Sequence, residues 1–233
     1  MKKILLLSNS TLPNEPYLDW AIDKIKSFLG HKEHIIFIPY AGVTISYDEY
    51  TERLNSALER IGLKARGIHE FDNKEACLKQ ADAILVGGGN TFELLHQLYA
   101  NNLMNIIRDK VNTGTEYIGW SAGSNVATLS IKTTNDMPIT YPESFDALRL
   151  VNFQINPHYT EKVIPDHGGE SRKQRLQEYL TINNDAKVIC IPEGTYIEVN
   201  HDKTTYHGRE EGKILCNCGE IKEFSIQPGE SIK

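Results

Sequence analysis

The chain contains the stretch Tyr117-Ile118-Gly119-Trp120-Ser121-Ala122-Gly123, in which a short apolar run leads into a serine placed between two glycines. The residues that follow, Asn125 to Leu129, are compatible with a helix. A G-x-S-x-G pentapeptide between a strand and a helix typically places a nucleophilic serine on a sharp, strained turn, where only small neighbours fit. The backbone N–H of Ala122 and the start of the helix would then face the oxygen that becomes negative during acyl transfer. We therefore predict an α/β fold with Ser121 as the candidate nucleophile. The alternative is that the glycines serve only a tight turn and that the serine is incidental.

Short apolar, β-branched runs alternate with segments of helical period on both sides of this stretch. The alternation predicts a mostly parallel sheet with helices on both faces, which makes three layers. The runs are almost continuously apolar, as expected of strands that are buried on both faces. We predict strands of this sheet at Ile4–Leu7, Ile35–Ile38, Ala65–Ile68, Ala83–Val86, Tyr117–Trp120 and Val188–Ile191.

Apolar residues repeat at helical spacing between several of these strands. They predict helices over 18–28, ending before Gly30, and over 50–61, ending before Gly62. A third helix is predicted over 91–98, with Thr91 available to cap it. After about residue 195 the pattern changes to short strands separated by glycines, which predicts an antiparallel extension at the edge of the sheet. These strands are predicted at Tyr196–Val199, Thr204–Tyr206, Lys213–Leu215 and Ile221–Phe224. The length of 233 residues fits one α/β domain over residues 1–233, with two domains as the alternative.

A second glycine-rich stretch, Gly87-Gly88-Gly89-Asn90-Thr91, also lies between an apolar strand and a helix. Consecutive glycines let backbone N–H groups approach a ligand closely. This turn could supply the second oxyanion donor of a serine hydrolase. It could instead hold a phosphate, but Phe92 stands where a dinucleotide-binding G-x-G-x-x-G needs its third glycine. We therefore favour the oxyanion interpretation.

A serine hydroxyl needs a base within hydrogen-bond reach, and the base must itself be oriented by another group. Of the eight histidines, His158 follows an apolar stretch and Pro157, whose ring fixes the local backbone. His69 also ends a predicted strand and is the alternative base. Other histidines, such as His31, His34, His201 and His207, lie in polar turns and are expected at the surface.

The composition argues against several classes of function. Hydrophobic residues make up 40% and charged residues 24%, and no segment approaches the ~20 apolar residues needed to span a bilayer, so we expect no membrane partner. The apolar run after Lys2-Lys3 is too short for a secretion signal and fits a first strand, which predicts a cytoplasmic protein. A formal net charge of -6 disfavours nucleic acid. The four cysteines lack zinc-site spacing and are expected to be reduced thiols.

Several ordered segments together resemble the peptidase E family, also called dipeptidase E or α-aspartyl dipeptidase. The resemblance covers nearly the whole chain. The segments that carry it are Leu7–Pro13, Ile38–Thr44, Gly87–Phe92, Tyr117–Gly123, Thr133–Ile139, Phe145–Leu148, Ile155–His158 and Pro192–Gly194. It implies a fold like that of class I glutamine amidotransferases and hydrolysis of short peptides with N-terminal aspartate, without metal or cofactor.

The resemblance also implies roles for individual residues. Ser121 would be the nucleophile and His158 the base, and the N–H groups of Ala122 and of Gly88 or Gly89 would form the oxyanion hole. Either Asp136 or Glu193 could orient His158. Glu193 follows the end of a predicted strand, where parallel sheets place their active sites, whereas Asp136 lies in an irregular segment ahead of Pro138. We expect Glu193 to be the partner of His158 and Asp136 to be required, holding substrate.

Selection of an N-terminal aspartate needs a cation, because a guanidinium matches a carboxylate bidentately. The family motif glycine-glutamate-threonine-arginine stands here as Gly169-Glu170-Ser171-Arg172, with serine in place of threonine. Arg172 is therefore the candidate substrate-binding residue, ahead of Arg175, and Asn90 is a second candidate. The alternative is that Arg172, Lys173 and Arg175 form a solvated helix face balanced by Glu170 and Glu178. The rival functions are a cyanophycinase-like aspartyl-peptide hydrolase and a non-catalytic anion-binding module. The oligomeric state is not predicted.

Overall fold

The computed structural model describes residues 2–162 and 168–232, and within them seven strands form the larger of two sheets. Five strands run parallel, in the order β3-β2-β4-β5-β1, and the antiparallel hairpin β8–β9 continues the sheet beyond β1. The strands are β1 (Lys3–Leu7), β2 (Ile35–Ile38), β3 (Ala65–Gly67), β4 (Ala83–Val86), β5 (Glu116–Trp120), β8 (Thr195–Asn200) and β9 (Lys203–Gly208). The predicted α/β class with a mostly parallel sheet is confirmed.

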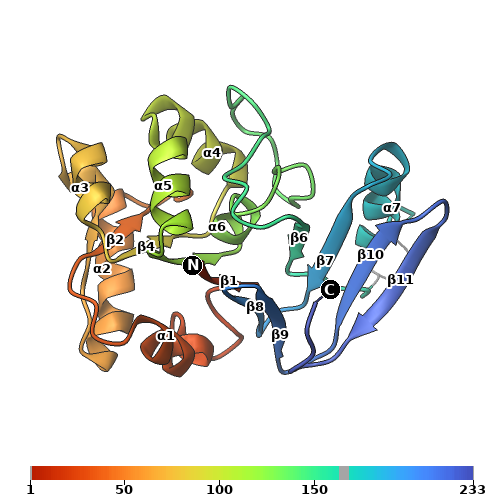
Figure 1. Ribbon diagram of the computed structural model, residues 1–233, viewed down its shortest axis with the longest axis horizontal. Helices are drawn as coiled ribbons and strands as arrows, with labels where there is room; N and C mark the ends of the chain where they lie inside the picture. The colour runs from red at the N-terminus through yellow and green to blue at the C-terminus, as the bar shows by residue number, and fades with distance from the viewer. Residues whose placement is uncertain (1, 163–167, 233) are drawn as a thin grey trace.

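Helices cover both faces of this sheet, because its strands alternate their side chains between two cores (Figure 1). Leu5 and Leu7 of β1 face the core under α1 (Ile22–Leu29) and α2 (Tyr47–Leu58). Ile4 and Leu6 face the opposite core, under α3 (Lys74–Gln80), α4 (Thr91–Ala100), α5 (Leu103–Asn112) and α6 (Ala122–Asn125). Short 3-10 helices lie at Asp19–Ala21, Glu59–Ile61 and Ile68–Glu70. The described residues contain no helix with the length and apolar character that a bilayer crossing requires.

A second sheet lies beside β8 and β9 and carries α7 (Arg172–Ile182) on its outer face (Figure 1). Its order is β11-β10-β7-β6, with β6 (Gln154–Pro157), β7 (Lys187–Ile191), β10 (Gly212–Asn217) and β11 (Ile221–Ile226). Ile155 of β6 and Ile189 of β7 belong to the same core as Ile4, so the inner face of this sheet packs against the main body.

Two sequence predictions about the sheet are corrected by this arrangement. The run Val188–Ile191 is a strand as predicted, but it pairs with β6 and β10 rather than joining the main sheet. The antiparallel extension is also divided: β8–β9 extend the main sheet and β10–β11 extend the second. The apolar run indicated burial on both faces and carried no signal for its pairing partners.

The helix starts show where polar side chains are used as caps. Ser46 and Glu49 form a capping box at the start of α2. At α4 the cap is Asn90, whose Oδ1 accepts from the N–H groups of Phe92 and Glu93 at 3.1 Å, so the prediction of Thr91 as the cap was wrong. Thr91 is buried, and its hydroxyl donates instead to the Asp136 carboxylate.

Candidate active site

Ser121 occupies the turn between β5 and α6 in a strained backbone conformation. Its φ is 52° and its ψ is -111°, which non-glycine residues rarely adopt. The two glycines of the pentapeptide are needed because a Cβ at either position would collide with neighbouring backbone, and not because their own φ angles are unusual. A Cβ on Gly119 would lie 2.3 Å from the Gly123 carbonyl oxygen, and one on Gly123 would lie 2.1 Å from the Val86 carbonyl oxygen. The motif therefore lets α6 sit directly against β4 and β5 below the serine.

A substitution tests this close packing. Gly123→Ala is expected to lower the free energy of unfolding by about 3 kcal/mol, because backbone must move to admit the methyl group. Urea denaturation monitored by circular dichroism measures the change. Gly168→Ala is the matched control, since a Cβ there meets no described atom within 4 Å, and its effect should stay within about 0.5 kcal/mol. Equal stability of the two variants would contradict the packing argument.

Ser121, His158 and Glu193 form a hydrogen-bonded series. The Ser121 Oγ lies 2.8 Å from His158 Nε2, and His158 Nδ1 lies 2.9 Å from Glu193 Oε1. His158 directly follows β6, and Glu193 follows β7 after Pro192. Because β6 and β7 are parallel neighbours with Pro157 opposite Ile191, the two side chains emerge at the same edge of the second sheet. Each sheet thus contributes to the series, the main sheet through Ser121 and the second through the other two.

Ser8 joins the two sheets beneath this series, and sequence reasoning gave it no role. It is fully buried at the end of β1, where its Oγ accepts from the His158 N–H at 2.9 Å and donates to the Ile191 carbonyl at 2.9 Å. His158 has a φ of 54°, a conformation that costs energy for a non-glycine residue and needs such support. The available signal was a polar residue directly after a buried strand.

The Gly87–Gly89 turn lies against Ser121. A Cβ on Gly88 would be 3.1 Å from the Ser121 Cβ, and Gly89 has a φ of 135° and approaches Ala41 so closely that a Cβ would be 2.1 Å from its carbonyl oxygen. Glycine is therefore required at position 89. The N–H groups of Gly88, Gly89 and Ala122 donate to none of the residues that the structure describes. They are thus available to an oxygen atom bound near Ser121.

Tyr50 fixes the orientation of this turn from α2. Its hydroxyl donates to the Gly88 carbonyl at 2.8 Å and accepts from the Trp120 Nε1–H at 3.3 Å. Burial raises the pKa of Tyr50, so the hydroxyl keeps its proton and stays a donor. With its carbonyl held towards Tyr50, Gly88 is restrained next to the serine. In the sequence, Tyr50 was recognisable only as the first residue of the helix predicted over 50–61.

Asp136 is bound to the glycine turn rather than to His158. Its Oδ2 accepts from the Thr91 N–H at 2.8 Å, the Thr91 hydroxyl at 2.5 Å and the Thr134 hydroxyl at 3.1 Å. On the other side of the same segment, the Asn135 amide donates to the Pro157 carbonyl at 2.9 Å. Residues 133–136 therefore connect the glycine turn to the loop that carries the histidine. Among the described hydrogen bonds, the carboxylate at His158 is that of Glu193.

Arg172 and Asn90 occupy different surroundings. Arg172 lies at the first turn of α7, and its Nη1 donates to the His158 carbonyl and, at 3.4 Å, to the Pro157 carbonyl. It is half-buried and bound to these carbonyls, whereas Arg175 is exposed, so the solvated-face alternative does not describe Arg172. Burial lowers the pKa of its guanidinium. Asn90 caps α4 and donates from Nδ2 to the Met137 carbonyl at 2.8 Å. Asn90 also lines the cavity at Ser121.

A cavity of about 650 Å³ opens onto the Ser121 and His158 side chains. Its walls come from residues 41–45, the glycine turn, the α2 residues Tyr50 and Arg53, and Ile139. The volume suits a small molecule or a short peptide.

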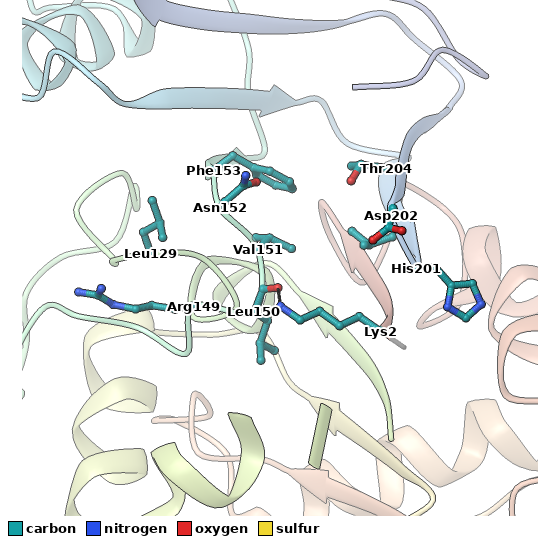
Figure 2. Close-up of a pocket in the computed structure, with 11 residues that line it drawn as sticks. Lys2, Leu129, Arg149, Leu150, Val151, Asn152, Phe153, His201, Asp202 and Thr204 are labelled. Carbon is teal, nitrogen blue, oxygen red and sulfur yellow. Dashed lines mark hydrogen bonds between the residues drawn. The ribbon is translucent and has the colours of Figure 1, made fainter. Parts of the chain in front are cut away.

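A second cavity of about 660 Å³ lies away from this site, between residues 149–153 and the β8–β9 hairpin. Figure 2 shows the Arg149 and His201 side chains at opposite ends of it and Lys2 directed at Leu150, to whose carbonyl it donates. Its polar groups do not converge on one point, so we place the candidate site at Ser121.

Other titratable groups lie outside the site. His69, the alternative base, contacts the Asp48 carboxylate at 2.8 Å beside Tyr47 and is absent from the cavity lining described above. The four cysteines are free thiols, with Cys216 and Cys218 Sγ atoms 3.8 Å apart. Among the described residues no cluster of three or more metal-binding side chains occurs.

Comparisons with known proteins agree on one family. The model of Peptidase family S51 matches residues 4–207. A protein named Peptidase E from Nostoc sp. is 51% identical over 85% of this chain and 82% of its own length. A Peptidase E from Shewanella sp. is 46% identical over 98% of this chain and 96% of its own length. The crystal structure of a putative Peptidase E protein from Listeria monocytogenes EGD-e has a TM-score of 0.68 and 25% identity, and the match covers 90% of this chain and 100% of that one.

Proposed function

The chain belongs to peptidase family S51 and is a serine peptidase, and from this premise we propose that it hydrolyses dipeptides, and slightly longer peptides, with an N-terminal aspartate. The single observation that best supports the proposal is the series Ser121, His158 and Glu193 at the mouth of a cavity of about 650 Å³. A cavity of this size suits a short peptide better than an extended chain. Because the family is one of peptidases, nothing supports the alternative that the chain is a non-catalytic anion-binding module.

In the proposed reaction Ser121 Oγ attacks the carbonyl carbon of the peptide bond after the N-terminal residue, while His158 Nε2 takes its proton. The peptide C–N bond then breaks, and His158 returns the proton to the leaving amine. Water attacks the resulting ester with His158 again as the base, which releases the N-terminal amino acid and restores the serine. Glu193 accepts from His158 Nδ1–H throughout, which holds the ring in the required tautomer and stabilises the imidazolium.

The oxyanion of the tetrahedral intermediate would be bound by the N–H of Ala122 and that of Gly88 or Gly89. Backbone donors of this kind stabilise negative charge as it develops, and removing one from an enzyme typically costs roughly 100-fold or more in kcat. We assign Asp136 a positioning role for this turn, through Thr91, in place of direct contact with substrate. Asn90, at the edge of the same turn, is proposed to contact the bound peptide.

We propose that Arg172 binds the side chain of the N-terminal aspartate. Its contacts with the loop carbonyls use Nη1, and a guanidinium has five N–H donors, so Nε and Nη2 are left for a carboxylate. Arg172→Ala is expected to lower the ratio of kcat/KM for Asp-Leu over Asn-Leu by roughly 10- to 100-fold. Parallel assays of the two peptides measure this ratio. Arg175→Ala, the control on an exposed position of the same helix, should keep the wild-type ratio, and an unchanged ratio in Arg172→Ala would remove Arg172 from the site.

The substrate class is tested by measuring amino-acid release from Asp-Leu, Asn-Leu and Leu-Leu by the wild-type chain, with and without a chelator. We expect hydrolysis of Asp-Leu alone, at the same rate in both conditions. Hydrolysis of Leu-Leu at the rate of Asp-Leu would keep the serine peptidase and discard the aspartate specificity. Loss of activity in the chelator would discard the expectation of a metal-free reaction. Release from β-aspartyl peptides in preference to Asp-Leu would favour the cyanophycinase-like alternative.

A further inference from the structure

Arg53 stands out among the residues around the cavity at Ser121. It is the one lysine, arginine, aspartate or glutamate among the described residues that line this cavity. The remaining lining side chains are apolar or uncharged, apart from that of His158, the proposed base. A carboxylate that enters the cavity would therefore meet a single permanent positive charge, on α2.

The Arg53 guanidinium is held in place but not neutralised. Its Cζ lies 4.7 Å from the centroid of the Tyr17 ring, and Tyr17 in turn packs edge-on against Trp120, the neighbour of Ser121. None of the ion pairs between described residues involves Arg53. By contrast Arg60, seven residues further along the chain in the 3-10 helix Glu59–Ile61, is paired with Asp19. Stacking uses the face of a guanidinium and leaves its edge, with the N–H donors, open to an anion.

The position of Arg53 relative to the reacting groups is also fixed. Arg53 lies three residues after Tyr50 in α2, so the two side chains share one face of the helix. Tyr50 donates to the Gly88 carbonyl, which ties this face to the proposed oxyanion turn. The charge of Arg53 is thus carried by an element that is anchored at the site of chemistry.

We propose that Arg53 binds a carboxylate of the peptide substrate. The inference rests on the proposed function and adds to it a second anion-binding group, on α2 over the main sheet, whereas Arg172 lies on α7 over the second sheet. A peptide such as Asp-Leu carries two carboxylates, the aspartate side chain and the C-terminus, and both present the same chemistry to a guanidinium. Arg53 lines the cavity, whereas Arg172 lies outside its lining and contacts the backbone carbonyl of His158, which lines it. One cation in the cavity and one beside it would match a substrate with two carboxylates, and would favour very short peptides, whose terminal carboxylate lies close to the bond that is cleaved.

Binding to full-length variants tests the proposal independently of turnover. Ser121→Ala and Ser121→Ala/Arg53→Met are titrated by calorimetry with Asp-Leu, Asn-Leu and Asp-Leu-amide. Methionine keeps an unbranched stem over the Tyr17 ring and removes the charge. The dissociation constant for Asp-Leu is expected to rise by roughly 5- to 20-fold in the Arg53 variant, as for a charged hydrogen bond at an exposed site. Arg53→Lys in the same background should recover part of the affinity.

The two analogues identify which carboxylate is bound. If Arg53 binds the C-terminus, the preference for Asp-Leu over Asp-Leu-amide falls in the variant. If it binds the aspartate side chain, the preference over Asn-Leu falls. Ser121→Ala/Arg66→Met is the matched control, because Arg66 is also an exposed arginine stacked on an aromatic ring, Phe71, but lies outside the cavity lining. It should retain both preferences.

The proposal would be overturned if the Arg53 and Arg66 variants bound each of the three ligands with equal affinity. It would also be overturned if neither variant bound any of them. Failure of the proposed function would show separately, as a wild-type chain that does not release amino acid from Asp-Leu. If the wild-type chain cleaves Asp-Leu but the Arg53→Met variant keeps both binding preferences, the proposed function stands and the role of Arg53 is rejected.

Discussion

Replacing Ser121 with alanine is expected to lower kcat/KM for Asp-Leu by roughly 10⁴- to 10⁶-fold, because the group that forms the acyl-enzyme is removed. The hydroxyl contacts His158 at 2.8 Å and has no capping bond to α6, so the fold should not depend on it. Amino-acid release and urea denaturation, measured on the same preparation, separate the two effects. The free energy of unfolding should change by less than about 0.5 kcal/mol.

A second substitution serves as the control for this result. His158→Ala should cost a similar factor, and the double variant Ser121→Ala/His158→Ala should be little worse than either single one, since the residues act as one unit. Additive losses would indicate that Ser121 and His158 contribute to separate steps. A Ser121→Ala variant with more than about one-tenth of wild-type activity would exclude Ser121 as the nucleophile.

Glu193→Gln is expected to lower kcat by roughly 10²- to 10⁴-fold, because an amide can present a donor to His158 Nδ1 and favour the wrong tautomer. The lower part of the range reflects the exposure of the Glu193 side chain, which is 49%. Asp136→Asn is the matched carboxylate-to-amide change. Asp136 holds the start of α4 and the glycine turn, so its loss should lower the free energy of unfolding by about 1–2 kcal/mol and kcat by less than roughly 10-fold.

Steady-state kinetics and denaturation of both variants decide between the two carboxylates. We expect the larger loss of kcat in Glu193→Gln and the larger loss of stability in Asp136→Asn. The reverse pattern, with kcat lost in Asp136→Asn at unchanged stability, would assign the partner of His158 to Asp136 and contradict the geometry described above.

The strands could be predicted closely from the sequence because most are continuous apolar runs ended by polar residues or glycine. Ile35–Ile38 and Ala83–Val86 match β2 and β4 to the residue. The same signal identified Val188–Ile191 as a strand but not the sheet to which it belongs, since burial on both faces does not specify the neighbouring strand. The result was a strand assigned to the wrong sheet. The position of Glu193 at the carboxyl end of that strand was nevertheless informative, because β6 ends beside it and carries His158.

The parts of the site that the sequence did not predict depend on contacts between distant segments. Ser8 and Tyr50 belong to ordinary strand and helix patterns, and their bonds to His158 and Gly88 span 150 and 38 residues of sequence. Arg53 reads as one more charged residue on the outer face of a helix until α2 is placed beside the cavity. Asp136 was expected to hold substrate, whereas its carboxylate is engaged by Thr91 and Thr134. The catalytic roles assigned to Ser121, His158 and Glu193 stay predictions.

The most direct test of the account is to map the site of covalent modification after reaction of the wild-type chain with a fluorophosphonate. Peptide mass spectrometry should find a single adduct on Ser121, and the adduct should be absent from His158→Ala after the same exposure, because the serine then lacks its base. An adduct on another residue, or none on an enzyme that still hydrolyses Asp-Leu, would contradict the assignment of Ser121 as the nucleophile.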